Sequence, residues 1–411
     1  MTNLKIKLVT AIATGAVLAS SVAPAFAADI TITGNGRDSE STASVTQNNT
    51  TSVSQSNNAT INNNTVVNSN TGGNKASDNL GGDVHVQSGD AKSNVSVANS
   101  ANSNVANVAN CGCDQGSTVS IDGNGRGSDN TVGLTQNNST ALGQSNNATV
   151  NNNTVVNSNT GNNKANDNLG QNGDVHVTSG NVDTTVGLTT AVNSNVAQIG
   201  GGSTGMGSGV SAKIVGNGRN SDNTIVLGMN NSASVSQSNN ALVNNNTNVN
   251  SNTGDNKAND NLGGDVMIDS GNAKSNISVD TMANFNAASL ENCGCDMTVN
   301  AKIASNLRDS DNTIGASFNN AQGIGQASLL TANNNTVDNA NTGNNKANDN
   351  GGDVNSDPHV TSGDSPATVD VTTSGNSNVV GTGLTVPMPG NNQVHFSFDW
   401  TGFGSLWSWL M

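Results

Sequence analysis

Short stretches in which apolar and polar residues alternate recur along the chain, and clusters of Gly, Asn and Asp separate them. Val84–Val86, Val95–Val97 and Ala59–Ile61 show this alternation clearly. Successive side chains of a β-strand point to opposite faces, so a period of two predicts strands. β-Branched residues bounded by turn-forming residues support the same prediction. The chain is therefore expected to be all-β, with helical periodicity confined to its N-terminus.

Four internal repeats of about 90 residues organise the chain. A motif close to NSNTGNNKANDN occurs at residues 68–79, 157–168, 250–261 and 339–350. Its threonines, Thr71, Thr160, Thr253 and Thr342, are 89, 93 and 89 positions apart. The same spacings separate three other sets: Arg37, Arg126, Arg219 and Arg308; Gln55, Gln144, Gln237 and Gln326; and the Asn triplets 62–64, 151–153, 244–246 and 333–335. Several sets in one register indicate a repeated structural unit rather than a bias in composition.

The register predicts the organisation of the chain. We expect a signal peptide at residues 1–27, repeats at 28–117, 118–210, 211–299 and 300–385, and a C-terminal tail at 386–411. If strands lie roughly 10 to 12 residues apart, two of them form one solenoid coil of about 20 residues. Each repeat would then contain about four coils. The predicted fold class is an all-β, repetitive β-solenoid of stacked short strands, with disorder as the alternative.

Asparagine dominates the composition, because about one residue in five is Asn, only 2% are aromatic and none is Tyr. So few large side chains cannot fill a conventional globular core. Disorder and a repetitive β structure both fit this composition, and the regular placement of Val, Ile and Leu favours the second. An Asn amide has a donor and an acceptor, so equivalent Asn residues can bond from coil to coil. Asn also tolerates tight corners, and the triplet 62–64 is expected to form a corner with such a ladder.

The N-terminus has the features of an export signal. Lys5 and Lys7 precede a mostly apolar stretch, and Ala25-Phe26-Ala27 places small residues where a signal peptidase requires them. We expect cleavage before Ala28 and a secreted, extracellular or cell-surface location. The apolar stretch is too short and too interrupted to span a bilayer, so no membrane span is predicted.

The net charge restricts the choice of partners. The formal charge is −15 for the whole chain, and it becomes −17 when Lys5 and Lys7 are removed with the signal peptide. Such an acidic chain disfavours nucleic acids and anionic membrane surfaces. Self-association, or other surface and matrix components, are the expected partners.

Four cysteines form two Cys-Gly-Cys pairs, Cys111 with Cys113 and Cys293 with Cys295. In an oxidising exterior, such residues usually form disulfides. With coils of about 20 residues, two repeats would separate the pairs by roughly 40 Å, which no disulfide can span. A local bridge within each pair, a bridge between molecules and a metal site remain, and we predict disulfides.

Aspartates recur in phase next to glycines, at Asp83, Asp174, Asp265 and Asp353. Carboxylates, amides and backbone carbonyls are ligands that calcium prefers, so these residues are weak calcium candidates. Asp is also an ordinary turn residue, and the nonapeptide repeat of calcium-binding β-helices is absent from the sequence. We expect a turn role for them.

No arrangement of residues predicts catalysis. The sequence shows no Ser/His/Asp order, paired catalytic carboxylates or phosphate-binding loop, and Gly34-Asn35-Gly36-Arg37 is too short to indicate a nucleotide site. His85 and His176 occupy equivalent strand positions, where the third repeat has Met267. The recurring Arg is expected to pair with Asp across coils. We predict a protein that is not an enzyme and has no cofactor.

The last segment differs from the repeats because it contains all three tryptophans, Trp400, Trp407 and Trp409. A hydrophobic cap for the end of the solenoid is one interpretation. A surface-anchoring or assembly tail is the other, and the sequence does not choose between them.

The segment Gln55–Ala59, with the downstream pattern Asn-Thr-Gly-x-Asn-Lys-Ala, resembles the repeats of curlin-type fibre subunits. It also resembles the Asn-rich repeats of bacterial surface β-solenoids. The resemblance covers residues 29 to about 380 and implies an extracellular fibre, matrix or adhesin role. We therefore predict a secreted or cell-surface structural or adhesive protein, with a calcium- or glycan-binding surface module as the alternative.

Overall fold

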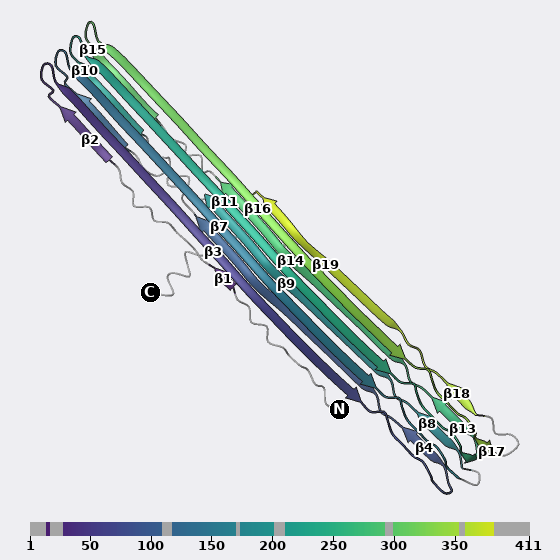
Figure 1. Cartoon of the computed structure of the whole chain (residues 1–411). Coiled ribbons are helices and arrows are strands. Elements are labelled where there is room, and N and C mark those ends of the chain that lie inside the picture. The colour runs from purple at the N-terminus through teal and green to yellow at the C-terminus, as the bar shows by residue number, and fades with distance from the viewer. Residues whose placement is uncertain are drawn as a thin grey trace, which may run out of the picture.

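Each repeat forms one coil of a parallel β-solenoid, and the coils stack into four layers (Figure 1). This computed structural model describes residues 14–16, 28–108, 117–169, 173–200, 210–291, 299–352 and 358–381. Apart from one short N-terminal strand, the described strands pair only with the equivalent strands of the neighbouring layers, and the pairs β3–β7, β7–β11 and β11–β16 of the long strands are all parallel. The predicted all-β solenoid is confirmed.

The strands of each layer follow one order along the chain. Layer one contains β2 (Ala28–Thr33), β3 (Glu40–Asn70), β4 (Val84–Gln87) and β5 (Ala91–Val108). Layer two contains β6 (Ser117–Asp122), β7 (Asp129–Asn159), β8 (Val175–Thr178) and β9 (Val182–Gly200). Layer three contains β10 (Val210–Asn217), β11 (Asp222–Asn252), β12 (Leu262–Gly263), β13 (Val266–Asp269) and β14 (Ala273–Glu291). Layer four contains β15 (Val299–Asn306), β16 (Asp311–Asn341), β17 (Gly351–Gly352), β18 (His359–Thr361) and β19 (Ala367–Val380). A short β1 (Thr14–Ala16), inside the predicted signal peptide, pairs with β5.

The layers stack in the register that the sequence repeats predict. Gln55 pairs with Gln144, Gln144 with Gln237 and Gln237 with Gln326. Each long strand has 31 residues and therefore extends about 100 Å, whereas the stack is only four layers deep, at about 4.8 Å per layer. The solenoid is thus a long, flat slab whose strands run along its length (Figure 1).

The expected coil of about 20 residues is wrong, because one whole repeat makes one coil. The triplet Asn62–Asn64 lies inside β3 rather than at a corner, although its predicted ladder exists. Asn is unfavourable in isolated strands, but here the amides of adjacent layers bond to one another and offset that preference. The stretches expected to be separate short strands therefore join into one long strand.

The NSNTGNNKANDN motif forms the turn that ends each long strand. In layer two, Thr160 Oγ1 donates to the carbonyl of Gly180 at 2.7 Å, and Asn163 Nδ2 donates to the Thr160 carbonyl at 2.8 Å. Asp167 has a φ of 56°, in the left-handed region that Asp tolerates. A Cβ atom at Gly161 would collide with the carbonyl of Gly254 in the next layer. Only glycine therefore allows the layers to approach closely at this corner.

Candidate functional site

A ladder of four glutamines runs through the interior, between the long sheet and the sheet that faces it. Gln144 Nε2 donates to Gln55 Oε1 at 2.7 Å, Gln237 Nε2 to Gln144 Oε1 at 2.8 Å, and Gln326 Nε2 to Gln237 Oε1 at 2.7 Å. Each Nε2 also donates to a carbonyl of the opposite sheet, and these carbonyls belong to Val105, Val196, Ala287 and Val379. One column of amides therefore connects the layers and also connects the two sheets.

Asparagine ladders lie beside the glutamines in the same interior. Asn146 Nδ2 donates to Asn195 Oδ1 at 2.8 Å across the sheets. Asn195 Nδ2 then donates to Asn239 Oδ1 at 2.8 Å and to Asn286 Oδ1 at 3.0 Å, both in the next layer. These bonds alternate between the two sheets as they pass from layer to layer, so they hold both sheets in one register.

Apolar clusters fill the interior between the amide ladders. The largest lies at the end of the slab that contains β6 and β10, and it includes Ile121, Ile214 and Leu227. Another, which we call the valine cluster, lies toward the other end and includes Val156, Val249 and Ile277. A slip of one residue in a long strand would move its apolar residues and amides to the solvent face, so this pattern specifies the register.

The first and last layers leave strand edges open. Among the described strands, β3 and β16 each have a neighbour on one side only, and each is 31 residues long. In the last layer, Ile314 is 49% exposed and Phe318 is 59% exposed, although the equivalent positions in layer three are buried. An open edge of this length presents a row of backbone donors and acceptors to any strand that matches it.

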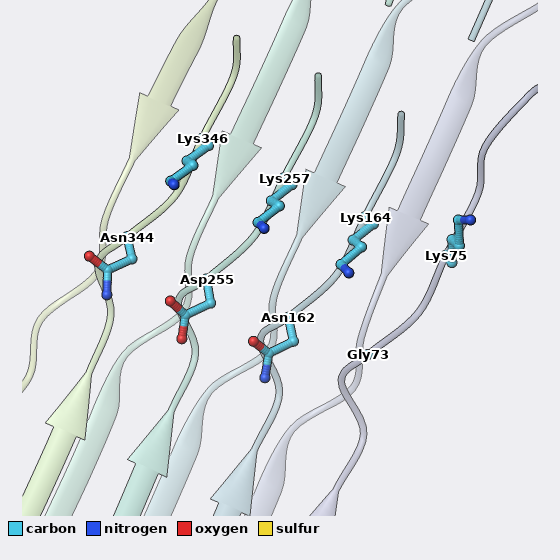
Figure 2. Close-up of a pocket in the computed structure, with 8 residues that line it drawn as sticks. All are labelled: Gly73, Lys75, Asn162, Lys164, Asp255, Lys257, Asn344 and Lys346. Atoms are coloured by element: carbon cyan, nitrogen blue, oxygen red, sulfur yellow. The ribbon is translucent and has the colours of Figure 1, made fainter. Parts of the chain in front are cut away.

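Four stacked lysines line a groove above the turns, one lysine in each layer (Figure 2). The residues are Lys75, Lys164, Lys257 and Lys346, and their backbones pair from layer to layer. Within the part of the chain that the structure describes, no carboxylate lies within ion-pair distance of these ammonium groups. The groove also contains the Asp255 carboxylate and amide groups, and chemically it offers a strip that can contact anions.

The four cysteines lie outside the described residues, so their disulfides stay a prediction. The expected separation of roughly 40 Å between the two pairs is wrong, because one repeat is one layer. Val108 pairs with Ile199, and Ile199 pairs with Leu290. The strand positions that precede the two pairs are therefore about two layer spacings apart, roughly 10 Å. Distance along the solenoid consequently no longer argues against a bridge between Cys111 or Cys113 and Cys293 or Cys295.

Three of the calcium candidates, Asp83, Asp174 and Asp265, lie in equivalent positions at the edge of a turn, and the carboxylates of the first two contact the backbone of the neighbouring layer. Asp83 Oδ1 accepts the N–H of Asp174 at 3.1 Å, and Asp174 Oδ1 accepts the N–H of Asp265 at 2.9 Å. Asp353 lies outside the described residues. Across the ranges that the structure covers, no three His, Cys, Asp or Glu side chains converge as a metal site would require.

The described histidines and arginines lie in columns on the outside of the slab. His85 stacks on His176, with ring centroids 5.3 Å apart, and Met267 and His359 continue the same column. Arg219 Nε lies 3.4 Å from Asp309 Oδ2 in the next layer. This contact confirms the predicted Arg–Asp pairing across layers at that position.

The structure brings together residues that sequence reasoning did not single out. The inward glutamines and asparagines of β3 occupy the same alternate positions as Val53, Ile61 and Val67. This alternation is the sequence pattern from which their burial could have been predicted.

The aromatic tail and most of the predicted signal peptide lie outside the described residues. No helix in the described ranges has the length and hydrophobicity needed to cross a membrane. Comparison with family models, curated proteins and solved structures gave no match to this chain.

Proposed function

We propose that this chain is a secreted or cell-surface structural and adhesive protein rather than an enzyme, and that its copies stack end to end into fibres or a matrix. The observation that carries the proposal is that, among the described strands, β3 and β16 each have an open edge, at opposite ends of a stack whose layers repeat in register. A free edge that matches the opposite edge of the same molecule favours heterologous contacts that extend without closing.

The two open edges carry the same amide side chains at several equivalent positions. If the last layer of one copy met the first layer of another in the existing register, Gln326 would lie over a second Gln55. The triplet 333–335 would lie over a second triplet 62–64, and Asn341 over a second Asn70. Such a junction would continue the backbone pairing and the amide ladders that already connect the four layers.

Features of the sequence support an extracellular role. Lys5, Lys7 and Ala25-Phe26-Ala27 form the predicted export signal, which would direct the mature chain out of the cytoplasm. The resemblance to curlin-type subunits and Asn-rich surface solenoids points to the same kind of protein. The acidic charge keeps single copies apart in solution, so salt should promote assembly.

Electron microscopy of the purified mature protein tests this proposal. We expect filaments about 100 Å wide, the length of a long strand, and fibre diffraction with a reflection near 4.8 Å along the filament axis. Assembly should be measured over a range of salt and pH, with sedimentation to detect small oligomers. A protein that stays monomeric in all these conditions at high concentration would refute the proposed fibre or matrix.

A further inference from the structure

One interior column changes its chemistry in the last layer. Val67, Val156 and Val249 are stacked backbone partners, and Val156 and Val249 are fully buried in the valine cluster. The fourth member of this column is Asp338, which pairs with Val249. A carboxyl group therefore occupies, in the terminal layer, a position that is apolar in the other three.

The surroundings of Asp338 are mostly apolar. Its strand partner in layer three is Val249. The sheet on the other side of the interior contributes Ile277 of the valine cluster and Val369, the β19 partner of Ile277. Neither carboxylate oxygen has a hydrogen-bond partner of normal geometry, and neither does the hydroxyl of Ser275 nearby. Burial raises the pKa of Asp338, and Ser275 offsets part of that rise.

A second copy docked in register would complete the burial of this carboxyl group. Its Val67 would lie directly over Asp338, and its Val95 and Val97 would cover Val369 and Val371. The three incoming residues that would cover Asp338, Val369 and Val371 are valines, which carry no donor. The nearest incoming hydroxyl is that of Ser93, the first-layer equivalent of Ser275, and it would lie over Ala367. An unpaired charge in such a place strongly opposes association, whereas a neutral carboxyl group opposes it far less.

We propose that the Asp338 carboxyl group controls end-to-end assembly. The last layer accepts the first layer of a second copy when this carboxyl group is protonated, and it opposes docking of that layer when the carboxyl group is charged. This inference rests on the proposed stacking function and adds its regulation. The occupant of the last layer is a second copy, because the first layer supplies the matching register, the matching amides and three valines for this site. An inward charge on an edge strand is a known means of preventing unwanted pairing.

No other titratable group among the described residues faces Asp338. On β14 and β11 the facing residues are Ser275, Ile277 and Val249. On β19, Asp370 alternates with Val369 and Val371 and therefore lies on the opposite face of the sheet. The pH response of docking at this position therefore belongs to Asp338.

The direction of the response follows from linkage. Docking removes Asp338 from water, so the docked state binds its proton more tightly than the free state does. Assembly is then favoured at acidic pH and weakens as pH rises through the titration of this group. Because each junction takes up at most one proton at Asp338, the contribution of this group should raise the critical concentration by at most about tenfold per pH unit.

The test measures the critical concentration for assembly of the full mature chain between pH 4 and pH 8, at constant ionic strength. Asp338→Val restores the residue of the other three layers and should assemble at neutral pH at least about tenfold more readily than the natural chain. Its critical concentration should also depend less on pH than that of the natural chain, and the dependence that remains is due to the other carboxylates of this acidic chain. Asp338→Asn should fall between the two, because it is neutral but still polar. Asp370→Asn removes the same charge from the outer face of the same layer and should leave the pH dependence intact.

The outcomes separate this inference from the function on which it rests. One outcome is fibres whose critical concentration is equal at pH 4 and pH 8 and unchanged by Asp338→Val. This result would contradict control of assembly by Asp338 but would agree with the proposed fibre role. A chain that stays monomeric at every pH, with and without Asp338→Val, would overturn both. Hydrogen exchange on such a monomer would then show why it does not assemble. Slow exchange of the β16 backbone amides would mean that the chain's own tail covers the last layer.

Discussion

Asn245 and Asn246 are neighbours in β11, and each belongs to an amide ladder that runs through the layers, but they lie on opposite faces of the sheet. Asn245 is 3% exposed, and its Nδ2 donates to Asn334 Oδ1 at 2.7 Å and to Thr281 Oγ1 at 3.2 Å. Asn246 is exposed, and its Nδ2 donates to Asn153 Oδ1 at 2.9 Å. Water can replace the partners of Asn246 but has no access to those of Asn245. Burial, rather than the number of amide bonds, therefore decides which ladders hold the layers together.

The largest effect is expected where a buried amide also connects the two sheets. Gln237→Leu would leave Gln144 Oε1 without its donor in the next layer, and it would remove the cross-sheet bond to the Ala287 carbonyl. We expect a loss of about 2 to 4 kcal/mol in the free energy of unfolding, because buried polar groups would remain unpaired. Urea unfolding of the monomer, followed by circular dichroism, measures this loss.

Two further variants show whether the unpaired amides cause the loss. Met229→Leu places the same side chain on the same inward face of β11, and it should cost less than about 1.5 kcal/mol because no polar partner is lost. Replacing Gln55, Gln144, Gln237 and Gln326 together by Leu should cost less than four times the single change, because no amide of the column then remains unpaired. A strictly additive result would contradict the explanation by unpaired amides.

The register of the stack could be predicted from sequence, whereas the size of the coil could not. The Thr, Arg and Gln sets are 89, 93 and 89 residues apart, and the strands pair at those offsets. The Asn triplets looked like corners because Asn alone favours turns. Their true place in a long strand depends on partners 89 or 93 residues away, and a local pattern does not contain that information. The error in coil length then produced the error in the distance between the cysteine pairs.

The end of the stack shows a second limit of sequence reasoning. The repeat alignment already places Asp338 with three valines, but among so many polar residues one Asp attracts no attention. Its meaning depends on knowing that this column is buried and that layer four is terminal. Similarly, the recurring Asp residues attracted attention as calcium ligands, and the structure shows the carboxylates of Asp83 and Asp174 accepting backbone N–H groups.

An intermediate effect is expected from Asn245→Thr. The Thr side chain suits a strand, but it is too short to bond both Asn152 and Asn334, which lie on either side in the stack. We expect a loss of about 1 to 3 kcal/mol in the free energy of unfolding. The urea midpoint of the variant measures it, with an unchanged dependence on urea as the sign that the fold is kept. A midpoint equal to that of the natural chain would mean that the inner ladder contributes little to stability.

The smallest effect is expected from Asn246→Thr, which makes the same substitution one residue away on the outer face. The variant loses the bond to Asn153 Oδ1 at 2.9 Å and the bond from Asn335 Nδ2 at 2.9 Å, but water can pair with all the groups that are left. Thr also has a higher preference for strands than Asn, so the two contributions oppose each other. The free energy of unfolding should therefore change by less than about 0.5 kcal/mol. Since the two variants share the strand, the layer and the new side chain, the difference between their urea midpoints isolates burial. Equal losses at both positions would show that the ladder bonds themselves, on either face, hold the layers together.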